Sequence, residues 1–424
     1  MATSRCASSR RSFVLPARSA RHLALERAFR AAHGRLIAAL VRRFGTSQLA
    51  VVETAVQEAG LRALERWDGD PNGKELEGWL LRVAHNAAVD TLRRERRSVP
   101  VHEQHLGVAP PSTPELDDEL RLIFLCCHPA LPRAAQIALT LRIAYGFSTA
   151  QIARAFLSDE RTIAQRIVRA KQRLRDEGMQ FDLPEPDELP SRLPPILDVL
   201  YQLFTEGYST TDSEAGIDEA LCDESLRIVR LLTDDRRWTS PAAEALRALA
   251  CFHVARAPAR TADDGSLVLL HEQDRARWDE ELLAEGFRFL ARSSRGQEVS
   301  RFHVEAGIAA CHAKAPSYAA TEWGDIVALY DVLREMSPSP VVDVNRALAV
   351  AMERGAVAGL DELDAIPERE LLGRYPYALA TYAELHASLG HLDEARAFLD
   401  RALEQQTSPA ERALLRRKRA ALAR

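Results

Sequence analysis

The sequence predicts an all-α protein, and three observations support this fold class. Apolar residues recur at spacings of three and four, the period of an amphipathic helix, in the series Leu25, Phe29, Leu36, Leu40 and Phe44. The chain has no sustained alternation of apolar and polar residues rich in Val, Ile and Thr, which would predict strands. Its 424 residues, of which 46% are apolar and 28% charged, are typical of a folded protein with two or three domains.

Two proline-rich stretches divide the chain into helical blocks. Residues 98–114 are predicted to form a linker between a first block, 22–97, and a second block, 115–178. Residues 183–195 hold five prolines and mark a second boundary. Beyond it we expect a helical extension, 184–295, and a repeat region, 296–424. Residues 1–21 are expected to be a disordered basic arm or an over-long start.

The composition excludes several classes of protein. It does not fit a wholly disordered chain, a collagen-like fibre or a disulfide-stabilised miniprotein. Charged residues interrupt the apolar stretches well before the roughly 18–20 residues that span a bilayer, so no membrane segment is predicted. The apolar run 13–15 is too short for a secretion signal. The six cysteines include no CxxC pair, which indicates a reducing cytoplasm.

The net charge of −5 is divided unevenly. Residues 1–178 hold 28 basic and 19 acidic residues, a net charge of +9, whereas residues 179–424 hold 28 basic and 42 acidic residues, a net charge of −14. A basic half attracts a polyanion such as nucleic acid, which an acidic half repels. We therefore expect the two halves to have different partners.

The end of the chain shows a repeated helical pattern. Small and apolar residues lie at helix-crossing positions around a glycine turn, namely Ala383, Gly390, Ala395, Leu399 and Ala402. Ala347 and Gly355 lie 36 and 35 residues before Ala383 and Gly390, close to the roughly 34-residue period of a tetratricopeptide repeat. The pattern predicts TPR-like helical repeats that bind a protein or peptide. The alternative is an irregular array of helical hairpins.

The second block contains a predicted helix-turn-helix. Ser148 and Gln151 have the form of a capping box that starts a short helix, which turns Ile152, Ala153 and Phe156 inward and breaks at 157–159. A second helix is predicted over 160–176, with an apolar face of Ile163, Ile167, Ala170 and Leu174. Its other faces carry six positive charges, on Arg161, Arg166, Arg169, Lys171, Arg173 and Arg175. Such a helix fits the major groove of DNA. The alternative is a solvated helix in a bundle.

The first block ends in a predicted helix, 79–97, with a core face and a polar face. The expected buried stripe is Trp79, Leu80, Val83, Ala87 and Leu92. The polar residues become more basic toward the C-terminus, in the order Arg82, Asn86, Asp90, Arg93, Arg94, Arg96 and Arg97. Taken alone, Trp79 suits a core position better than base stacking, so this helix by itself indicates little about function.

In combination, these segments resemble an extracytoplasmic-function (ECF) RNA polymerase sigma factor of the sigma-70 family over residues 22–178. Residues 56–64 resemble the region 2.2 helix that docks on polymerase, and residues 79–97 resemble regions 2.3 and 2.4, which open and read the minus-ten promoter element. Residues 139–175 resemble region 4, which reads the minus-thirty-five element. The tail resembles the helical, repeat-bearing extension of one sigma subgroup, through residues 204–208, 221–224 and 271–278.

The resemblance implies three sets of site residues. The polymerase-binding set is Val56, Gln57 and Glu58. The minus-ten set is Trp79, Asn86, Asp90, Arg93 and Arg94. The minus-thirty-five set is Arg161, Thr162, Gln165, Arg166 and Arg169. The chain departs from the common pattern in having Gly60 where a bulky residue, often Phe, is frequent, and in having Ala164, Ile167 and Val168 where some members carry polar or basic groups. These departures leave the promoter sequence open.

Two polar segments suggest enzymatic alternatives. Cys126, Cys127 and His128 are adjacent, but neighbouring helical cysteines point about 100° apart and no second ligand pair lies nearby, so packing is favoured over zinc. Residues His271, Glu272, Asp274 and Arg275 suggest an acid/base site. Helix capping and bracing are favoured there, because the chain has no glycine-rich phosphate loop, nucleophile elbow or HExxH motif. We predict no catalytic activity, cofactor or metal.

The sequence therefore predicts a cytoplasmic alternative sigma factor whose partners are core RNA polymerase and promoter DNA. The rival interpretation is a DNA-binding regulator that works without polymerase and carries a protein-binding tail; the 56–64 helix favours the sigma factor. A hydrolytic enzyme in the tail is a third interpretation. The charge division predicts that the acidic tail regulates the basic half, either by masking it or, as we favour, by bracing its active arrangement.

Overall fold

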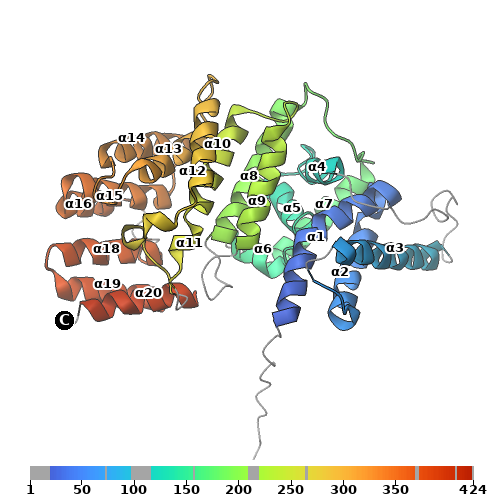
Figure 1. The fold of residues 1–424 in the computed structure, drawn as a ribbon, viewed down its shortest axis with the longest axis horizontal. Helices are drawn as coiled ribbons and strands as arrows, with labels where there is room; N and C mark the ends of the chain where they lie inside the picture. The colour runs from blue at the N-terminus through green and yellow to red at the C-terminus, as the bar shows by residue number, and fades with distance from the viewer. Residues whose placement is uncertain are drawn as a thin grey trace, which may run out of the picture. The chain divides into compact units, whose positions relative to one another are not determined.

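The structure is a computed structural model that describes residues 20–71, 74–96, 116–155, 158–208, 219–262, 266–367, 372–405 and 408–422. The regular elements in these ranges are helices, with one isolated β-bridge between Thr261 and Leu267, so the all-α prediction is confirmed (Figure 1). The expected arm lies outside the described residues as far as residue 19, while Ala20 and Arg21 already belong to the first helix. The expected linker, 98–114, lies wholly outside them.

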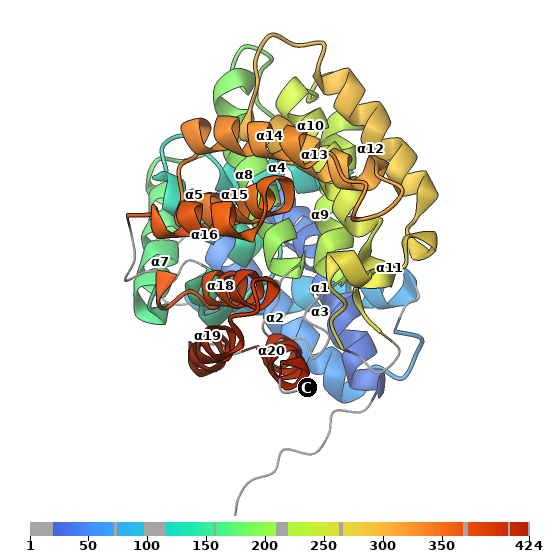
Figure 2. The same cartoon turned by 90° about the vertical axis from the view of Figure 1, so that its left-hand side faces the viewer.

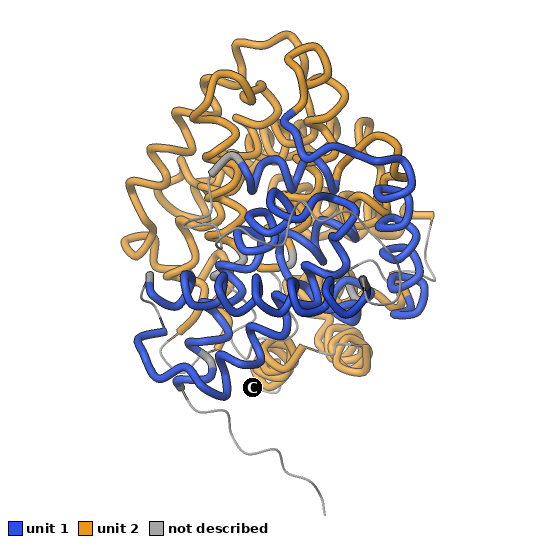
Figure 3. The backbone as a smooth tube through the Cα atoms, turned by 90° about the vertical axis from the view of Figure 1, so that its right-hand side faces the viewer, with its two compact units in different colours: residues 1–126, 138–153, 159–183 blue, residues 127–137, 154–158, 184–424 orange. Residues whose placement is uncertain are grey.

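The chain divides into two compact units, coloured separately in Figure 3. Unit 1 comprises residues 1–126, 138–153 and 159–183. Unit 2 comprises residues 127–137, 154–158 and 184–424. The last border therefore falls at the start of the proline-rich stretch 183–195. Residues 127–137 and 154–158 group with unit 2, although they lie inside the second predicted block.

Unit 1 contains a short 3-10 turn, η1, and seven described helices, of which α5 and α6 have residues 133–137 and 154–155 in unit 2. Their bounds are α1 (Ala20–Phe44), η1 (Thr46–Gln48), α2 (Leu49–Arg66), α3 (Lys74–Arg96), α4 (Leu116–Cys126), α5 (Arg133–Ile143), α6 (Thr149–Ala155) and α7 (Glu160–Asp176). The core of the first three helices includes the fully buried side chains of Leu36, Leu40, Val52 and Leu80. Burial of each such side chain contributes roughly 1.5–3 kcal/mol to stability, before the entropy cost of ordering the chain.

Gly60 in α2 allows a close approach between two helices of unit 1. A Cβ atom at this position would lie 2.7 Å from the ring of Phe29 in α1, closer than carbon atoms pack. The Phe29 ring thus occupies the space that a bulky residue at position 60 would need. An aromatic side chain from α1 therefore takes the place of the bulky residue that is frequent at position 60.

Unit 2 is a longer array of helices. Their bounds are α8 (Leu189–Tyr208), α9 (Glu219–Asp234), α10 (Pro241–Val254), α11 (Ala257–Arg260), α12 (Glu280–Ser293), α13 (Arg301–Lys314), α14 (Trp323–Met336), α15 (Pro340–Arg354), α16 (Ala356–Asp364), α18 (Pro376–Ser388), α19 (Leu392–Gln405) and α20 (Pro409–Ala421). α10 packs against α8, α9, α12 and α13. Residues 243–252 of α10 are consequently all buried.

An ion network around the buried Arg247 joins three of these helices. Arg247 of α10 donates to Glu285 of α12 at 2.7 Å and to Asp234 of α9 at 2.5 Å, and its guanidinium lies 3.8 Å from the ring centroid of Phe289. Arg230 of α9 donates to the same Glu285 carboxylate at 2.6 Å. Burial by itself raises the pKa of Glu285, but the hydrogen bonds from both arginines outweigh it and lower that pKa to about 2.

The predicted repeat pattern corresponds to two helical hairpins, α15/α16 and α18/α19, which lie next to each other in Figures 1 and 2. Gly355 and Gly390 both adopt positive φ, 97° and 81°, a conformation that glycine tolerates and other residues strain to adopt. The alanines and leucine at the predicted crossing positions are buried, namely Ala347, Ala383, Ala395, Leu399 and Ala402. The hairpins and their glycine turns are therefore as the sequence predicts.

Candidate nucleic-acid interface

Local hydrogen bonds define the two helices of the helix-turn-helix. The Ser148 backbone N–H donates to the Gln151 side chain at 2.9 Å, and the Gln151 N–H donates back to Ser148 Oγ at 3.2 Å, so the predicted capping box starts α6. Asp159 caps α7 by accepting from the Thr162 N–H at 2.8 Å and the Thr162 hydroxyl at 2.6 Å. These bonds lower the pKa of Asp159. α7 spans Glu160–Asp176, as predicted.

α7 separates an apolar face from a polar one. Its buried residues are the predicted ones, Ile163, Ile167, Ala170 and Leu174, whereas the predicted inward residue Phe156 of the preceding segment lies outside the described residues. The residues of the expected minus-thirty-five set are exposed, except that Arg166 is half-buried; the set is Arg161, Thr162, Gln165, Arg166 and Arg169. The helix thus presents a row of hydrogen-bond donors and positive charge.

One residue on this face was noted in the sequence only as a departure from the family pattern and was not assigned to the site. The Val168 side chain is 63% exposed, next to Arg169 and one turn after Gln165. An exposed aliphatic group among polar side chains suits contact with the methyl group of thymine, which apolar side chains read in the major groove. In the sequence, Val168 stands out only as an apolar residue that does not follow the spacing of the buried face of α7.

The six basic residues of α7 do not share one environment. Lys171 is half-buried and forms an ion pair with Glu53 of α2. Arg173 pairs with Glu177 at 2.7 Å, at the end of the helix. The six charges therefore do not form one uniformly exposed surface, because a buried carboxylate from a distant helix draws the Lys171 side chain inward.

α3 carries the residues of the expected minus-ten set on its solvent side. Asn86, Asp90, Arg93 and Arg94 are exposed. Their spacing of four, three and one residues places them along one face of the helix. Trp79 is half-buried and packs against Trp67, with ring centroids 5.6 Å apart. The Trp79 indole is therefore partly exposed beside the polar face of α3 and is not a core side chain.

The buried stripe predicted for α3 is partly wrong. Leu80 and Ala87 are buried, but Trp79, Val83 and Leu92 are only half-buried. α3 packs against both α2 and α1, so its buried surface is wider than a single stripe. The additional buried residues include Leu76, Leu81, Ala84 and Ala88.

The three residues expected to bind polymerase lie on α2 in different environments. Val56 is fully buried, so its side chain supports the helix from within. Gln57 and Glu58 are half-buried, and Glu58 pairs with Arg62 at 2.5 Å on the same helix. Leu61, which the sequence reasoning did not single out, is 64% exposed one turn from both. These residues form a mixed apolar and polar patch.

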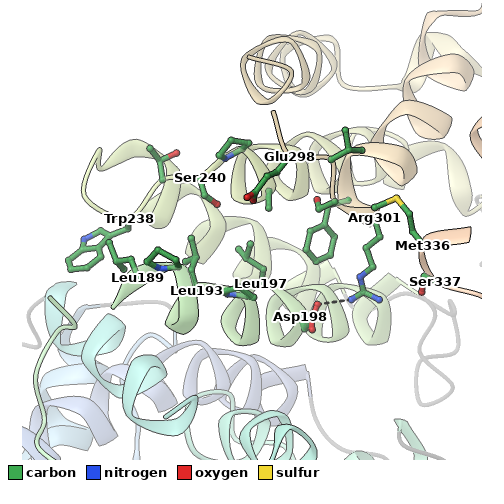
Figure 4. A pocket seen from close by; sticks show the side chains of 18 of the residues that line it. Leu189, Leu193, Leu197, Asp198, Trp238, Ser240, Glu298, Arg301, Met336 and Ser337 are labelled. Atoms are coloured by element: carbon green, nitrogen blue, oxygen red, sulfur yellow. Dashed lines mark hydrogen bonds and ion pairs between the residues drawn. The ribbon is translucent and has the colours of Figure 1, made fainter. Parts of the chain in front are cut away.

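Unit 2 contains a cavity of about 850 Å³ between α8 and the segment that leads into α13 (Figure 4). Leu189, Leu193 and Leu197 line one side. At one end, Asp198 accepts a hydrogen bond from Arg301 at 2.9 Å. Asp198 also pairs with Arg133, the first residue of α5, which in turn donates to the Pro194 carbonyl at 3.2 Å. One carboxylate of α8 therefore holds the start of α5.

The two segments weighed as enzymatic sites make packing and capping contacts. Cys126 and Cys127 are fully buried. Asp274 accepts from the Ala276 N–H at 3.0 Å, and Arg275 donates to the carbonyl oxygens of His312 and Ala315 at 2.6 and 2.8 Å. These contacts are the capping and bracing that the sequence favoured. Within the described ranges, no group of three or more His, Cys, Asp or Glu side chains is arranged to hold a metal ion.

Matches to protein families divide the chain in a way similar to the blocks predicted from the sequence. The family described as Sigma-70 region 2 matches residues 29–98, and the family described as Sigma-70, region 4 matches residues 121–174. A family of unknown function, DUF6596, matches residues 192–294. An uncharacterised protein of Rhizobium meliloti (strain 1021) is 37% identical over 390 residues, which cover 89% of this chain and 91% of that protein. No solved structure matches. None of the described helices is long and apolar enough to cross a membrane.

Proposed function

Because the chain belongs to the ECF sigma factors of the sigma-70 family, in the form that carries a C-terminal helical extension, we propose that it binds core RNA polymerase in the cytoplasm and starts transcription at two-part promoters. The observation that carries this proposal is the pair of exposed polar surfaces on α3 and α7. Each surface is backed by an apolar face that holds its helix in place.

α7 is proposed to read the minus-thirty-five element. An α-helix fits the major groove, and the residues near its N-terminus reach base edges. Arg161, Thr162, Gln165 and Arg166 occupy the first two turns of α7, so they are assigned to bases. Arg169 lies one turn later and is assigned to bases or the phosphates beside them.

α3 is proposed to meet the minus-ten element during strand opening. Asn86 and Asp90 offer hydrogen-bonding groups, while Arg93 and Arg94 add positive charge for the phosphate backbone. The half-exposed indole of Trp79 lies at the start of the same helix. An aromatic ring in this position offers a surface on which an unpaired base can stack.

α2 is proposed to dock on polymerase through Gln57, Glu58 and Leu61. The exposed Leu61 supplies the apolar contact, since a protein interface commonly has an apolar centre with a polar rim. Val56 contributes only by packing, because its side chain is fully buried.

The C-terminal extension is proposed to brace the region-4 helices and so regulate activity. Arg133 lies within the region-4 match and Asp198 within the match to the family of unknown function, and the two side chains form an ion pair. The charge difference between the two halves of the chain favours further contacts of the same kind.

Two measurements test the proposed function together. The full chain should co-purify with core RNA polymerase and support run-off transcription from a promoter upstream of its own coding sequence. Leu61→Ser should abolish co-purification, whereas Arg161→Ala should leave it intact and reduce promoter-specific transcripts. Specific DNA binding by the chain alone, without any association with core enzyme, would instead identify a polymerase-independent regulator.

A further inference from the structure

Residues 266–279 form a strap in unit 2 that arginines hold to the helical array. Arg275 within the strap donates to the carbonyl oxygens of His312, at 2.6 Å, and Ala315, at 2.8 Å. Arg417 of α20 donates to the carbonyl oxygen of Leu267 at 3.1 Å. The strap contains the motif 271–278, which neither the polymerase surface nor the DNA surfaces use.

The strap contributes one wall of a cavity of about 190 Å³ that is lined by five ring-bearing and five aliphatic residues, together with Asn345 and Glu384. His271 of the strap lies 5.6 Å from Tyr318, and Tyr318 lies 5.0 Å from Trp323, between ring centroids. The His312 ring centroid lies 5.3 Å from that of Trp323, and Tyr330 also lines the cavity. Five rings from the strap, α13, α14 and the loop between these helices therefore contribute to the lining of one small space, which we call the aromatic cage.

The cage combines rings with one carboxylate. Glu384 of α18 is the one acidic residue among those that line the cavity, and Lys418 donates to it at 2.8 Å. Burial, reinforced by two nearby arginines, lowers the pKa of His312 to about 4, so its ring is neutral at neutral pH. Burial and the charge of Glu384 raise the pKa of Tyr318 to about 12, so this hydroxyl stays protonated.

We propose that the aromatic cage binds an alkylammonium group. Aromatic faces attract such a cation, and the carboxylate of Glu384 complements its charge. An ammonium group already meets this carboxylate in the structure, in the form of Lys418. The volume is below the roughly 300–1,000 Å³ of pockets for drug-sized ligands, so it suits a head group or a single side chain.

The ammonium group has two possible sources. It is either a free small amine or a lysine side chain of a peptide. A second cavity of about 410 Å³ shares Leu269, His271 and Glu384 with the cage and offers room for the rest of a larger ligand. The proposal does not depend on the sigma activity, because the cage lies wholly within unit 2.

The test is calorimetric titration of the full-length chain with choline and with 3,3-dimethyl-1-butanol, its uncharged analogue. Saturable binding of choline without binding of the alcohol is expected. Equal binding of both compounds would show that the cavity is merely apolar and would overturn the proposal. A second pair of titrations tests the lysine side chain of a peptide as the source of the ammonium group. It compares a short peptide that has one central lysine with the same peptide carrying norleucine at that position. Binding of the lysine peptide alone assigns the cage to a peptide side chain.

Variants tie the binding to the cage. Glu384→Gln and Trp323→Leu should each weaken it about tenfold, and Trp323→Phe should preserve most of it. Lys418→Ala should strengthen binding, because it removes the internal competitor for Glu384. Asp400→Asn is the matched control, since Asp400 of α19 is similarly exposed and also pairs with a cation of α20 but does not line the cage. Failure of both ligands to bind, or unchanged binding in Glu384→Gln, refutes the proposal.

Discussion

Glu53 in α2 accepts a hydrogen bond from Arg142 in α5 at 2.6 Å, across 89 residues of sequence. The same carboxylate pairs with Lys171 of α7, and its side chain is only 8% exposed. Glu53 therefore joins the region-2 helices to the region-4 helices within unit 1. A promoter spacing of roughly 17 base pairs separates the two readers by about 58 Å. Under the function proposed above, helices in direct contact cannot reach both elements, so we expect the contacts of Glu53 to break when the protein binds a promoter.

Glu53→Gln is expected to favour the open arrangement. Charged hydrogen bonds contribute roughly 1.5–3 kcal/mol when buried, and less when partly exposed, so core polymerase should bind about two- to tenfold more tightly. Glu177→Gln is the control, because it removes a partner of Arg173 within the end of α7. Binding is measured by fluorescence anisotropy with labelled protein. Equal affinity of the Glu53 variant and the parent chain would show that the contact does not oppose polymerase binding.

Arg166→Ala and Arg173→Ala should have different effects on DNA recognition. Arg166 lies in the second turn of α7, where side chains reach base edges, so its loss should cost about 1–3 kcal/mol and relax the preference at one minus-thirty-five position. Arg173 lies near the C-terminus of the helix and should weaken binding equally for all sequences. Binding of polymerase holoenzyme to a set of single-base promoter variants measures both effects. A sequence-independent loss in both proteins would contradict the assignment of Arg166.

Asp198→Asn is expected to lower promoter-specific transcription about two- to fivefold, since an exposed or half-exposed ion pair contributes roughly 0–1 kcal/mol. The substitution weakens the hold of α8 on Arg133 at the start of α5. Association with core polymerase, measured in parallel, should not change. Asp331→Asn is the matched control. Asp331 of α14 also pairs with an arginine, but this is Arg346 of α15 in the first repeat hairpin. Identical transcription by both variants and the parent would argue against a bracing role.

The network around Glu285 should make unit 2 sensitive to acid. The folded-state pKa of Glu285 is about 2 against an ordinary value of 4.5, so its contribution to stability is complete above pH 4.5 and is lost as the pH falls from 4.5 toward 2. Glu285→Gln should remove this dependence and cost about 1–3 kcal/mol at neutral pH, because it removes one of the two carboxylates that pair with the buried Arg247. Urea unfolding of both proteins at several pH values measures the difference. A parallel pH dependence in the variant would rule out Glu285 as the titrating group.

Gly60→Phe should destabilise unit 1 by about 1–3 kcal/mol, because its side chain would overlap the Phe29 ring. Phe29→Ala alone should also destabilise, since it leaves a cavity. The double variant, with the ring moved from α1 to α2, should recover part of the loss. Thermal unfolding of the three variants measures this coupling, and simple additivity of the two single losses would disprove it.

The sequence alone determined the features whose causes are local. The bounds of α7 follow from the capping residue Asp159 and the apolar period of Ile163, Ile167 and Leu174, all within a few turns. The hairpin turns follow from Gly355 and Gly390, which occupy a backbone conformation that few other residues accept. The family resemblance of residues 22–178 likewise rests on short motifs that can be read in order along the chain.

Only the tertiary structure decided which distant residues meet. Glu53 is one of many glutamates in the sequence, and nothing near it indicates that Arg142 and Lys171 are its partners. The aromatic cage draws its rings from 271 to 330 and its carboxylate from Glu384. The periodicity of a helix shows which face is apolar but carries no information about the helix that covers it. Ion pairs and cavities between helices depend on that packing, and so they appear only when the chain is folded.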